Sequence, residues 1–426
     1  PQQPPQQQQQ QQQQQSKHVY DLHIIPHCYV DKVLYETVDS TADITCTANI
    51  GGFPCRKRAI GVEATVTVMP AATAPLDGAE AVKQRLTRNL HPPAGTKKVR
   101  IRVKAKVVVS AAGALHTPAL LQRSGLRGKG DLVGKHLTLH PVLGVGGVFK
   151  DGEDTRLASG VSMGVVVRNP PIAAPLSTGA DVDLQYPVAA ETPPLHAGLM
   201  GIMFPWSRIG GGLAVKLGMT MWRRSSTFIF ISRDRSQRSN RVEIDSEGNP
   251  MLFYTIQEKK QGEEGDDLQM LLNGLITNMR FMRAAGASFV YTPHENFPWH
   301  YCGGDKVEEA ERFEKYLEQV RSEGVKISSM QVFSAHQMSS CRMAADPAKG
   351  PTSPSGELFE CANLFISDAS VFPTSLGINP MVTIESFAHM ISRNIIARLE
   401  RDHPALKSKI NAFRGASTAC SSNQQW

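Results

Sequence analysis

Residues 363–389 read NLFISDASVFPTSLGINPMVTIESFAH, and this stretch predicts a short buried strand, a turn and an amphipathic helix in succession. The apolar run at 363–367 is typical of a buried strand, and it ends at Asp368. After Pro380, apolar residues recur every three or four positions, which predicts one apolar face of a helix. We expect Pro380 at the first helical position, where its missing N–H costs nothing, and Asn379 as the helix cap.

A loop of small residues precedes this unit. In FSAHQMSSCRM, residues 333–343, His336 is followed by small and sulfur-bearing side chains, which let other groups approach the backbone. If a flavin lies against the helix N-terminus, the partial positive charge of that end favours the reduced, negatively charged ring. A histidine and an amide at the other face of the ring can then hold a substrate hydroxyl. The imidazole takes the hydroxyl proton as hydride leaves the carbon.

The segment HQMSSCRM and the strand–turn–helix stretch closely resemble the C-terminal signature of the glucose–methanol–choline (GMC) oxidoreductases, and they are most similar to the long-chain fatty alcohol oxidase branch. The resemblance implies FAD-dependent oxidation of a primary long-chain alcohol to the aldehyde, with hydride passed to the flavin and O2 reduced to H2O2. It implies that His336 is the catalytic base and Asn379 its partner at the hydroxyl. Four further residues would lie along the flavin's diphosphate and ribityl chain or against its ring: Asp368, Ala369, Pro380 and Met381.

Two residues depart from the family pattern, because Ser339 and Ala344 stand where glycine is usual. Either side chain would crowd a backbone that must approach a cofactor or adopt a positive φ. Taken singly, the site residues also have structural interpretations: His336 as a hydrogen-bonded histidine, Asn379 as a cap and Asp368 as a turn residue. Their occurrence together, in the family's order, favours the functional interpretation.

A second stretch, VVVSAAGALHTPALLQRSGL at residues 107–126, predicts a buried strand, a turn of small residues and a helix capped by Thr117 and opened by Pro118. It resembles the second GMC signature. By that resemblance, Ala112 and Gly113 let the adenosine half of FAD approach the backbone. A tight strand–helix junction in any α/β protein is the alternative.

Two shorter segments extend the resemblance. IIPHCYVDKVLYE at residues 24–36 resembles the GMC strand whose backbone, near Val30 here, packs beside the adenine. VGKHLTLHP at residues 133–141 resembles a segment that runs close to the flavin. From the residues alone, the apolar and aromatic residues from His18 to Val38 predict two short strands around Pro26, and the alternation at residues 99–106 predicts a strand with one polar face.

The expected fold class is mixed α/β and α+β, with a partial FAD-binding Rossmann-like domain and a substrate domain built of a sheet and helices. The substrate domain is expected to contain strands at 199–206, 227–232 and 251–256, a helix at 267–285 and a later helix capped by Asp305. Its apolar sheet is interpreted as the floor of an alkyl channel or as a plain packed face. The expected divisions are 1–16, a low-complexity, disordered Gln-rich tract; 17–145, the partial FAD-binding domain; 146–327, the substrate domain; 328–400, the C-terminal FAD-binding and catalytic segment; and 401–426, a tail.

The sequence lacks the strand, G-x-G-x-x-G and helix that usually begin a flavin-binding Rossmann half. The glycines of Gly144-Val-Gly146-Gly147 lie in a strand-like apolar run with no helix behind them, so they do not predict a phosphate loop. We therefore expect an N-terminally incomplete chain. The alternative to an alcohol oxidase is a truncated or non-catalytic chain that cannot hold FAD by itself, and a nicotinamide dehydrogenase is disfavoured by the same absence.

Composition and charge bear on the partners and the compartment expected for the chain. The 426 residues carry a net charge of +7, and six arginines between positions 223 and 241 contribute to it. A solvated surface is the preferred interpretation of these arginines, with anionic lipid as the alternative, and no nucleic-acid motif accompanies them. The seven scattered cysteines indicate neither a disulfide framework nor a metal site, which suits a reducing, intracellular compartment. Membrane-associated and peroxisomal locations, and the oligomeric state, stay open.

Overall fold

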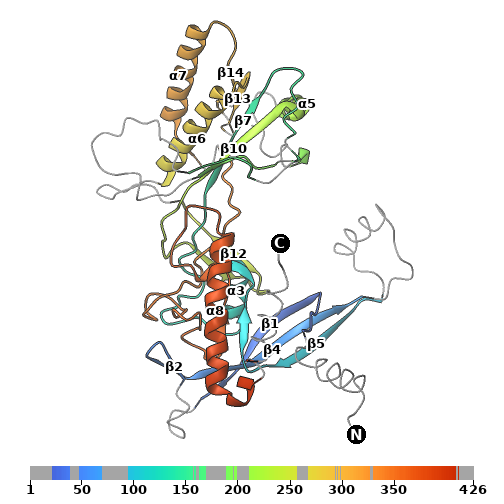
Figure 1. The fold of residues 1–426 in the computed structure, drawn as a ribbon, viewed down its shortest axis with the longest axis vertical. Coiled ribbons are helices and arrows are strands. Elements are labelled where there is room, and N and C mark those ends of the chain that lie inside the picture. The colour runs from blue at the N-terminus through green and yellow to red at the C-terminus, as the bar shows by residue number, and fades with distance from the viewer. Residues whose placement is uncertain are drawn as a thin grey trace, which may run out of the picture.

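The computed structural model shows two lobes stacked along the long axis of the molecule (Figure 1). The expected Gln-rich tract and the expected strand at 199–206 lie outside the residues that it describes. Those residues are 22–38, 48–69, 95–156, 158–159, 163–168, 189–194, 196–198, 211–256, 267–326, 330–408 and 411, without 293, 295 and 298.

The lower lobe contains a three-stranded antiparallel sheet in the order β1-β4-β5 and a parallel pair, β6 with β15. Among the described residues, it also contains helices α3 and α8 and two hairpins, β2–β3 and β11–β12. The strands are β1 (Cys28–Thr37), β2 (Ala48–Ile50), β3 (Phe53–Cys55), β4 (Lys57–Val68), β5 (Lys97–Lys104), β6 (Val108–Ser110), β11 (Arg241–Ile244), β12 (Pro250–Phe253) and β15 (Leu364–Ile366). The helices are α3 (Gly113–Arg123) and α8 (Met381–Asp402), with short 3-10 turns η3 (Ala369–Val371) and η4 (Pro404–Leu406).

The upper lobe is a six-stranded sheet in the order β14-β13-β7-β10-β9-β8, with helices α6 and α7 packed on it. The strands are β7 (Val142–Val148), β8 (Val166–Arg168), β9 (Ala189–Glu191), β10 (Ser225–Ile231), β13 (Phe289–Tyr291) and β14 (Trp299–Tyr301). The helices are α5 (Gly211–Thr220), α6 (Asp267–Ala284) and α7 (Lys306–Glu323), with the 3-10 turn η2 (Trp222–Arg224). The mixed α/β class expected from the sequence is confirmed.

Each lobe has its own apolar core. In the lower lobe, Phe365 and Phe372 pack with Leu121 of α3 and Ile391 of α8. The apolar residues of α8 recur at the predicted three- and four-residue spacing, and this face points to that core. In the upper lobe, Leu143 of β7 packs against α6 and α7.

Several local predictions are confirmed. The glycine-containing run is strand β7, in which a Cβ at Gly146 would lie 1.8 Å from the Tyr291 ring. The Asp305 carboxylate caps α7 by accepting from the Val307 and Glu308 N–H groups. Helix α6 covers the predicted range almost to the residue.

The start of α3 differs from the prediction. The helix begins at Gly113, so Thr117 is not its cap and Pro118 lies inside it. A proline there has no N–H for the carbonyl four residues earlier, which is that of Ala114. The Ser340 hydroxyl donates to this carbonyl instead, at 2.6 Å, so a residue of the His336 loop completes the helix. The preceding valine run is also less buried than predicted, since Val109 is exposed.

The start of α8 differs by one residue. The helix begins at Met381, Pro380 occupies the cap position, and no side chain makes a capping hydrogen bond. Asn379 was expected at the cap position, but its side-chain amide donates to Glu191 instead. Around the predicted break at Pro26, residues 22–25 form no strand and β1 follows, while residues 18–21 of the expected first strand lie outside the described residues.

Two observations bear on the expected divisions. The boundary at 145/146 falls inside β7, which starts at Val142. The hairpin β11–β12 lies within 146–327 but packs on α3, where Gln122 Nε2 donates to the Val242 carbonyl at 2.9 Å and Arg123 to the Gly248 carbonyl at 2.8 Å.

The six arginines do not form a free cluster. Each contacts a neighbouring carboxylate, carbonyl or hydroxyl: Arg223 with Asp154, Arg224 with Asp151, Arg233 with Thr374, Arg235 with Asp267, Arg238 with Gly130 and Arg241 with Glu243. Across the described ranges, the helices are all too short or too polar to cross a bilayer.

Candidate active site

The loop that carries His336 is held between two other segments. Met338 exchanges backbone hydrogen bonds with Thr138 at 3.0 and 2.9 Å, and the Ser339 N–H donates to the Ala369 carbonyl at 3.1 Å. Ser339 has a φ of +68°, the left-handed conformation expected where the family has glycine. Its Oγ lies 2.7 Å from Thr138 Oγ1, and this buried hydrogen bond offsets part of the strain.

His336 is paired with a second histidine. The Nδ1 atoms of His336 and His140 lie 3.0 Å apart, and the two rings meet edge to face at 86°. His140 is fully buried, and its Nε2 accepts the backbone N–H of Gly377 at 2.8 Å. The pair therefore connects the His336 loop to the turn before α8.

Burial keeps both imidazoles neutral. The pKa of His140 falls from 6.5 to about 3, first because burial penalises the cation and then because a protonated His336 and the Arg233 guanidinium would repel it. Burial also lowers the pKa of His336. Neutral imidazoles at physiological pH can donate from one nitrogen and accept at the other.

Asn379 is bonded to an acidic side chain of the upper lobe. Its Nδ2 donates to Glu191 Oε2 at 3.3 Å, and Glu191 is the last residue of β9. Glu191 is 1% exposed, and burial raises its pKa, opposed by the hydrogen bond from Asn379. The start of α8 therefore lies where the two lobes meet. The histidine pair reaches the same turn through Gly377.

Asp368 joins the two predicted cofactor segments. Its Oδ2 accepts from the Gly113 N–H at 3.0 Å and from the Thr117 hydroxyl at 2.6 Å, and its Oδ1 accepts from the Ser370 N–H at 2.8 Å. The carboxylate is thus used inside the protein, at the ends of the parallel strands β6 and β15. Contact with a cofactor would fall to the backbone of Asp368 and Ala369. Ala112, beside Gly113, is exposed.

Val30 lies elsewhere. It is part of β1, paired with Ala64, and its carbonyl accepts from Arg123 Nη2 at 3.3 Å. Arg123 ends α3 and Gly113 begins it, so the two ends are about 16 Å apart along the helix axis. The structure therefore brings Asp368, Ala112 and Gly113 together but places Val30 at the other end of α3.

Two residues of this group were missed by the sequence analysis. His140 lies in the quoted segment VGKHLTLHP, and its position before Pro141 was the only available signal. No feature of the sequence pointed to Glu191, because its role depends on a contact between residues 188 positions apart.

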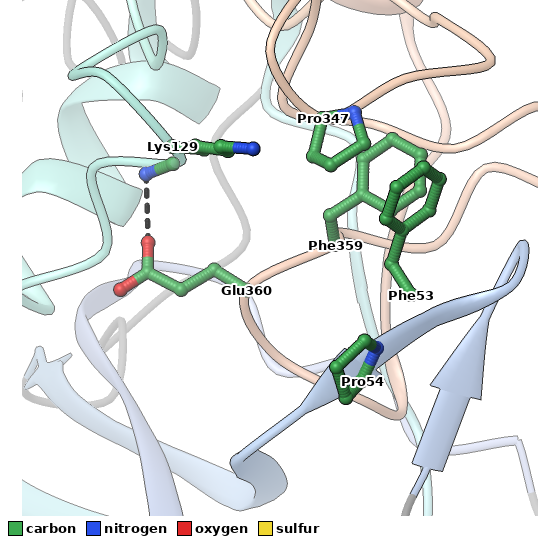
Figure 2. A pocket seen from close by; sticks show the side chains of 7 residues that line it. Phe53, Pro54, Lys129, Pro347, Phe359 and Glu360 are labelled. Carbon is green, nitrogen blue, oxygen red and sulfur yellow. Dashed lines mark hydrogen bonds between the residues drawn. The ribbon is translucent and has the colours of Figure 1, made fainter.

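Two other features of the described residues stand apart from this group. His300, Cys302 and Glu309 have ligand atoms within 4.8 Å of one another, but Arg283 already bonds to both oxygens of Glu309. Figure 2 shows a pocket of 440 Å³ in the lower lobe, in which Phe53 and Phe359 meet edge to face beside Glu360. Neither feature includes a predicted site residue.

Comparisons with known proteins identify relatives of this chain. Two family models, both described as GMC oxidoreductase, match residues 88–142 and 236–388 respectively. The long-chain-alcohol oxidase FAO3 of Arabidopsis thaliana is 35% identical over 302 residues, which cover 69% of this chain and 37% of that protein. The long-chain-alcohol oxidase FAO4A of the same plant is 31% identical, covering 70% of this chain and 38% of its own length. The chain thus spans less than two fifths of these relatives.

Two solved structures are also among the proteins to which this chain is similar. An FAD-dependent oxidoreductase from Chaetomium thermophilum is 16% identical with a TM-score of 0.45, covering 90% of this chain and 62% of its own. A formate oxidase is 11% identical with a TM-score of 0.46, covering 89% and 61%.

Proposed function

This chain belongs to the GMC oxidoreductase family, and on that premise we propose that it carries the catalytic part of an FAD-dependent oxidase of primary, long-chain alcohols. The main support is a set of contacts at the turn before α8: His336 reaches it through His140 and Gly377, and Asn379 of the same turn bonds to Glu191 of the upper lobe. The long-chain substrate class is carried over from the Arabidopsis relatives, whose names state it. A second support is that these four side chains come from both lobes, as a site between a cofactor domain and a substrate domain requires.

The residues at two places fit FAD. Helix α8 has no acidic residue in its first turn, and Met381 and Val382 are 66% and 67% exposed there. An apolar, positively polarised helix end of this kind suits a flavin ring. At the start of α3, Gly113 has a φ of +79° and open space where a Cβ would stand, which permits close approach of a ligand.

The residues that would hold FAD follow from this fit. The backbone of Asp368 and Ala369 would lie beside the diphosphate and ribityl chain, and Ala112 and Gly113 beside the adenosine half. Pro380 and Met381 would lie against the ring. The bound flavin would supply the acceptor for hydride. The backbone near Val30, which lies toward the other end of α3, would contact the adenine.

The chain's own side chains would bind and orient the alcohol. His336 and Asn379 each present a polar nitrogen at the lobe junction, and together they would hold the hydroxyl oxygen. A group with a free lone pair must take the hydroxyl proton as the aldehyde forms. His336 was predicted for this role, and Glu191 is a second candidate at the same site.

The experiment is anaerobic mixing of the flavin-loaded enzyme with primary alcohols of increasing chain length. We expect bleaching of the flavin absorbance that is fastest with long-chain alcohols, the aldehyde as product, and H2O2 when air is admitted. Methanol and a sterol serve as control substrates. Flavin that binds but is reduced by none of these alcohols would exclude the proposed reaction, and a protein that takes up no flavin would favour a non-catalytic chain.

A further inference from the structure

The backbone of Gly377 fixes the proton on His140. A peptide N–H can only donate, so His140 Nε2, 2.8 Å away, must present its lone pair. A neutral imidazole carries one N–H. The proton of His140 is therefore on Nδ1, the atom that faces His336.

The same reasoning extends to His336. The two Nδ1 atoms lie 3.0 Å apart, which leaves room for one proton between them. His140 supplies it, so His336 Nδ1 accepts. A neutral His336 then carries its own proton on Nε2. Which nitrogen of a histidine is protonated is set by the hydrogen bond at the other one.

From these contacts we propose that His140 is a positioning residue that locks His336 as a neutral hydrogen-bond donor through Nε2–H. Protonation of His336 would set two N–H groups against each other across 3.0 Å. His140 cannot relieve the conflict by reversing its tautomer, because its Nε2–H would then meet the Gly377 N–H. The hydrogen bonds therefore run in one direction: the Gly377 N–H donates to His140, and His140 Nδ1–H donates to His336.

The surroundings hold His140 in place. The Leu139 N–H donates to Asp234 Oδ2 at 2.9 Å, and the Leu139 carbonyl accepts from the Ser375 hydroxyl at 3.0 Å. Arg233 also adds positive charge near the His140 ring, which disfavours an imidazolium. These two side chains fix the main chain at Leu139, directly before His140, and the bonds at its two ring nitrogens fix the orientation of the imidazole.

The consequence for chemistry rests on the proposed function. A His336 that donates from Nε2 holds the alcohol oxygen and stabilises the negative charge that develops on it. Its only lone pair points at His140, so it does not take the hydroxyl proton in this state. The proton passes to another acceptor, and the buried Glu191 carboxylate, which is bonded to Asn379, has lone pairs at the same site. The O–H bond breaks toward that acceptor, and the C–H bond breaks with its electron pair toward the hydride acceptor that a bound flavin would supply, which leaves the aldehyde.

Two substitutions of His140 separate positioning from structure. His140→Asn places an amide N–H where Nδ1–H stands, so it keeps the donor to His336 but loses the acceptor for Gly377. His140→Gln places its carbonyl oxygen near the former Nε2, so it keeps the bond from Gly377 but loses the donor. A purely structural role would make the second variant the milder one.

The test is nitrogen NMR of the whole chain labelled with ¹⁵N-histidine, with the His336 signals assigned by their loss in His336→Gln. In the wild type at neutral pH, we expect His336 Nε2 to carry the proton and Nδ1 to have the shift of a lone-pair nitrogen. His140→Asn should preserve that pattern, and His140→Gln should give mixed tautomers. In the flavin-loaded enzyme, His140→Gln should lower kcat on the order of 10-fold or more with a smaller change in KM, since a wrong tautomer impairs transition-state contacts.

A wild-type spectrum showing His336 protonated at Nδ1, or as an imidazolium, would overturn the proposal. So would His140→Asn and His140→Gln giving the same tautomer mixture. The spectrum needs neither substrate nor turnover. A chain with the expected tautomer but no alcohol oxidation would therefore disprove the proposed function and leave the positioning of His336 intact.

Discussion

The carboxylate of Asp368 accepts the backbone N–H of Gly113 at 3.0 Å, across 255 residues of sequence. This contact joins the end of β15 to the first residue of α3, and it places a negative charge at the positive end of that helix. The same carboxylate accepts the Thr117 hydroxyl and the Ser370 N–H, and it is 9% exposed. Asp368 therefore connects the two segments expected to meet the cofactor through both of its carboxylate oxygens.

Removing that side chain should cost much of the stability of the lower lobe. We expect Asp368→Ala to lower the free energy of unfolding by about 3 kcal/mol or more, because three donors lose a charged acceptor. Urea denaturation followed by circular dichroism measures this. Asp346→Ala, which removes a carboxylate from an exposed loop turn, is the control and should cost less than about 1 kcal/mol. Equal losses in the two variants would show that the Asp368 contacts contribute little.

The sequence predicted the elements whose pattern is local. The apolar spacing in α8 and α6, the cap at Asp305 and the buried run of β7 depend on neighbours within a few residues, and all four are confirmed. The errors at Thr117 and Asn379 have one cause. Each side chain suits a cap, but a distant carboxylate, Asp368 or Glu191, provides a stronger partner.

Only part of the candidate site could be predicted, again because local sequence patterns do not reveal contacts between distant residues. His336 lies in a long family signature, whereas His140 and Glu191 reach the site through contacts 196 and 188 residues away in sequence. Contacts between residues so far apart in the chain leave no periodic pattern in the sequence. Val30 stays a prediction: its segment forms strand β1, and its carbonyl contacts Arg123 at the end of α3 opposite Gly113.

His336→Ala should abolish most turnover. In the flavin-loaded enzyme, we expect a decrease in kcat of about 10²–10⁴-fold, whether the imidazole donates to the substrate oxygen or accepts its proton. FAD should stay bound, as shown by an unchanged flavin spectrum. His389→Ala, an exposed histidine on α8, is the matched control and should retain activity. Near-normal turnover in the His336 variant would exclude this histidine from the reaction.

Asn379 and Glu191 should behave as a coupled pair. Asn379→Asp sets a second carboxylate against the buried Glu191, so one of the two must bind a proton or repel the other. We expect this variant to lose about 1–3 kcal/mol of unfolding free energy. Adding Glu191→Gln supplies an amide donor to the new aspartate and should recover most of the loss.

A double-mutant cycle of these variants in urea measures the coupling. We expect a coupling energy on the order of 1 kcal/mol or more. Strictly additive effects would show that the 3.3 Å contact between Asn379 and Glu191 is not maintained in solution.

The buried His140 should make the protein sensitive to acid. Its pKa is 6.5 when unfolded and about 3 in the folded protein, so between these values the unfolded chain binds a proton that the folded protein excludes. The stabilising effect of a neutral His140 is therefore complete above pH 6.5 and is lost as the pH falls toward 3. Each pH unit within that window should cost about 1.4 kcal/mol from this group.

Other buried or partly buried groups titrate in the same pH range, so their contributions to the unfolding free energy must be removed by a comparison. Burial lowers the pKa of His136 to about 4 and raises that of Asp234 to about 7, so their effects on stability oppose each other. Comparing the wild type with His140→Gln removes both, because both proteins contain them. We expect the difference in unfolding free energy between the two proteins to decrease steadily from pH 6.5 to pH 4.5 in urea titrations. A difference that stays constant over that range would mean that His140 is protonated, or reaches water, in the folded protein.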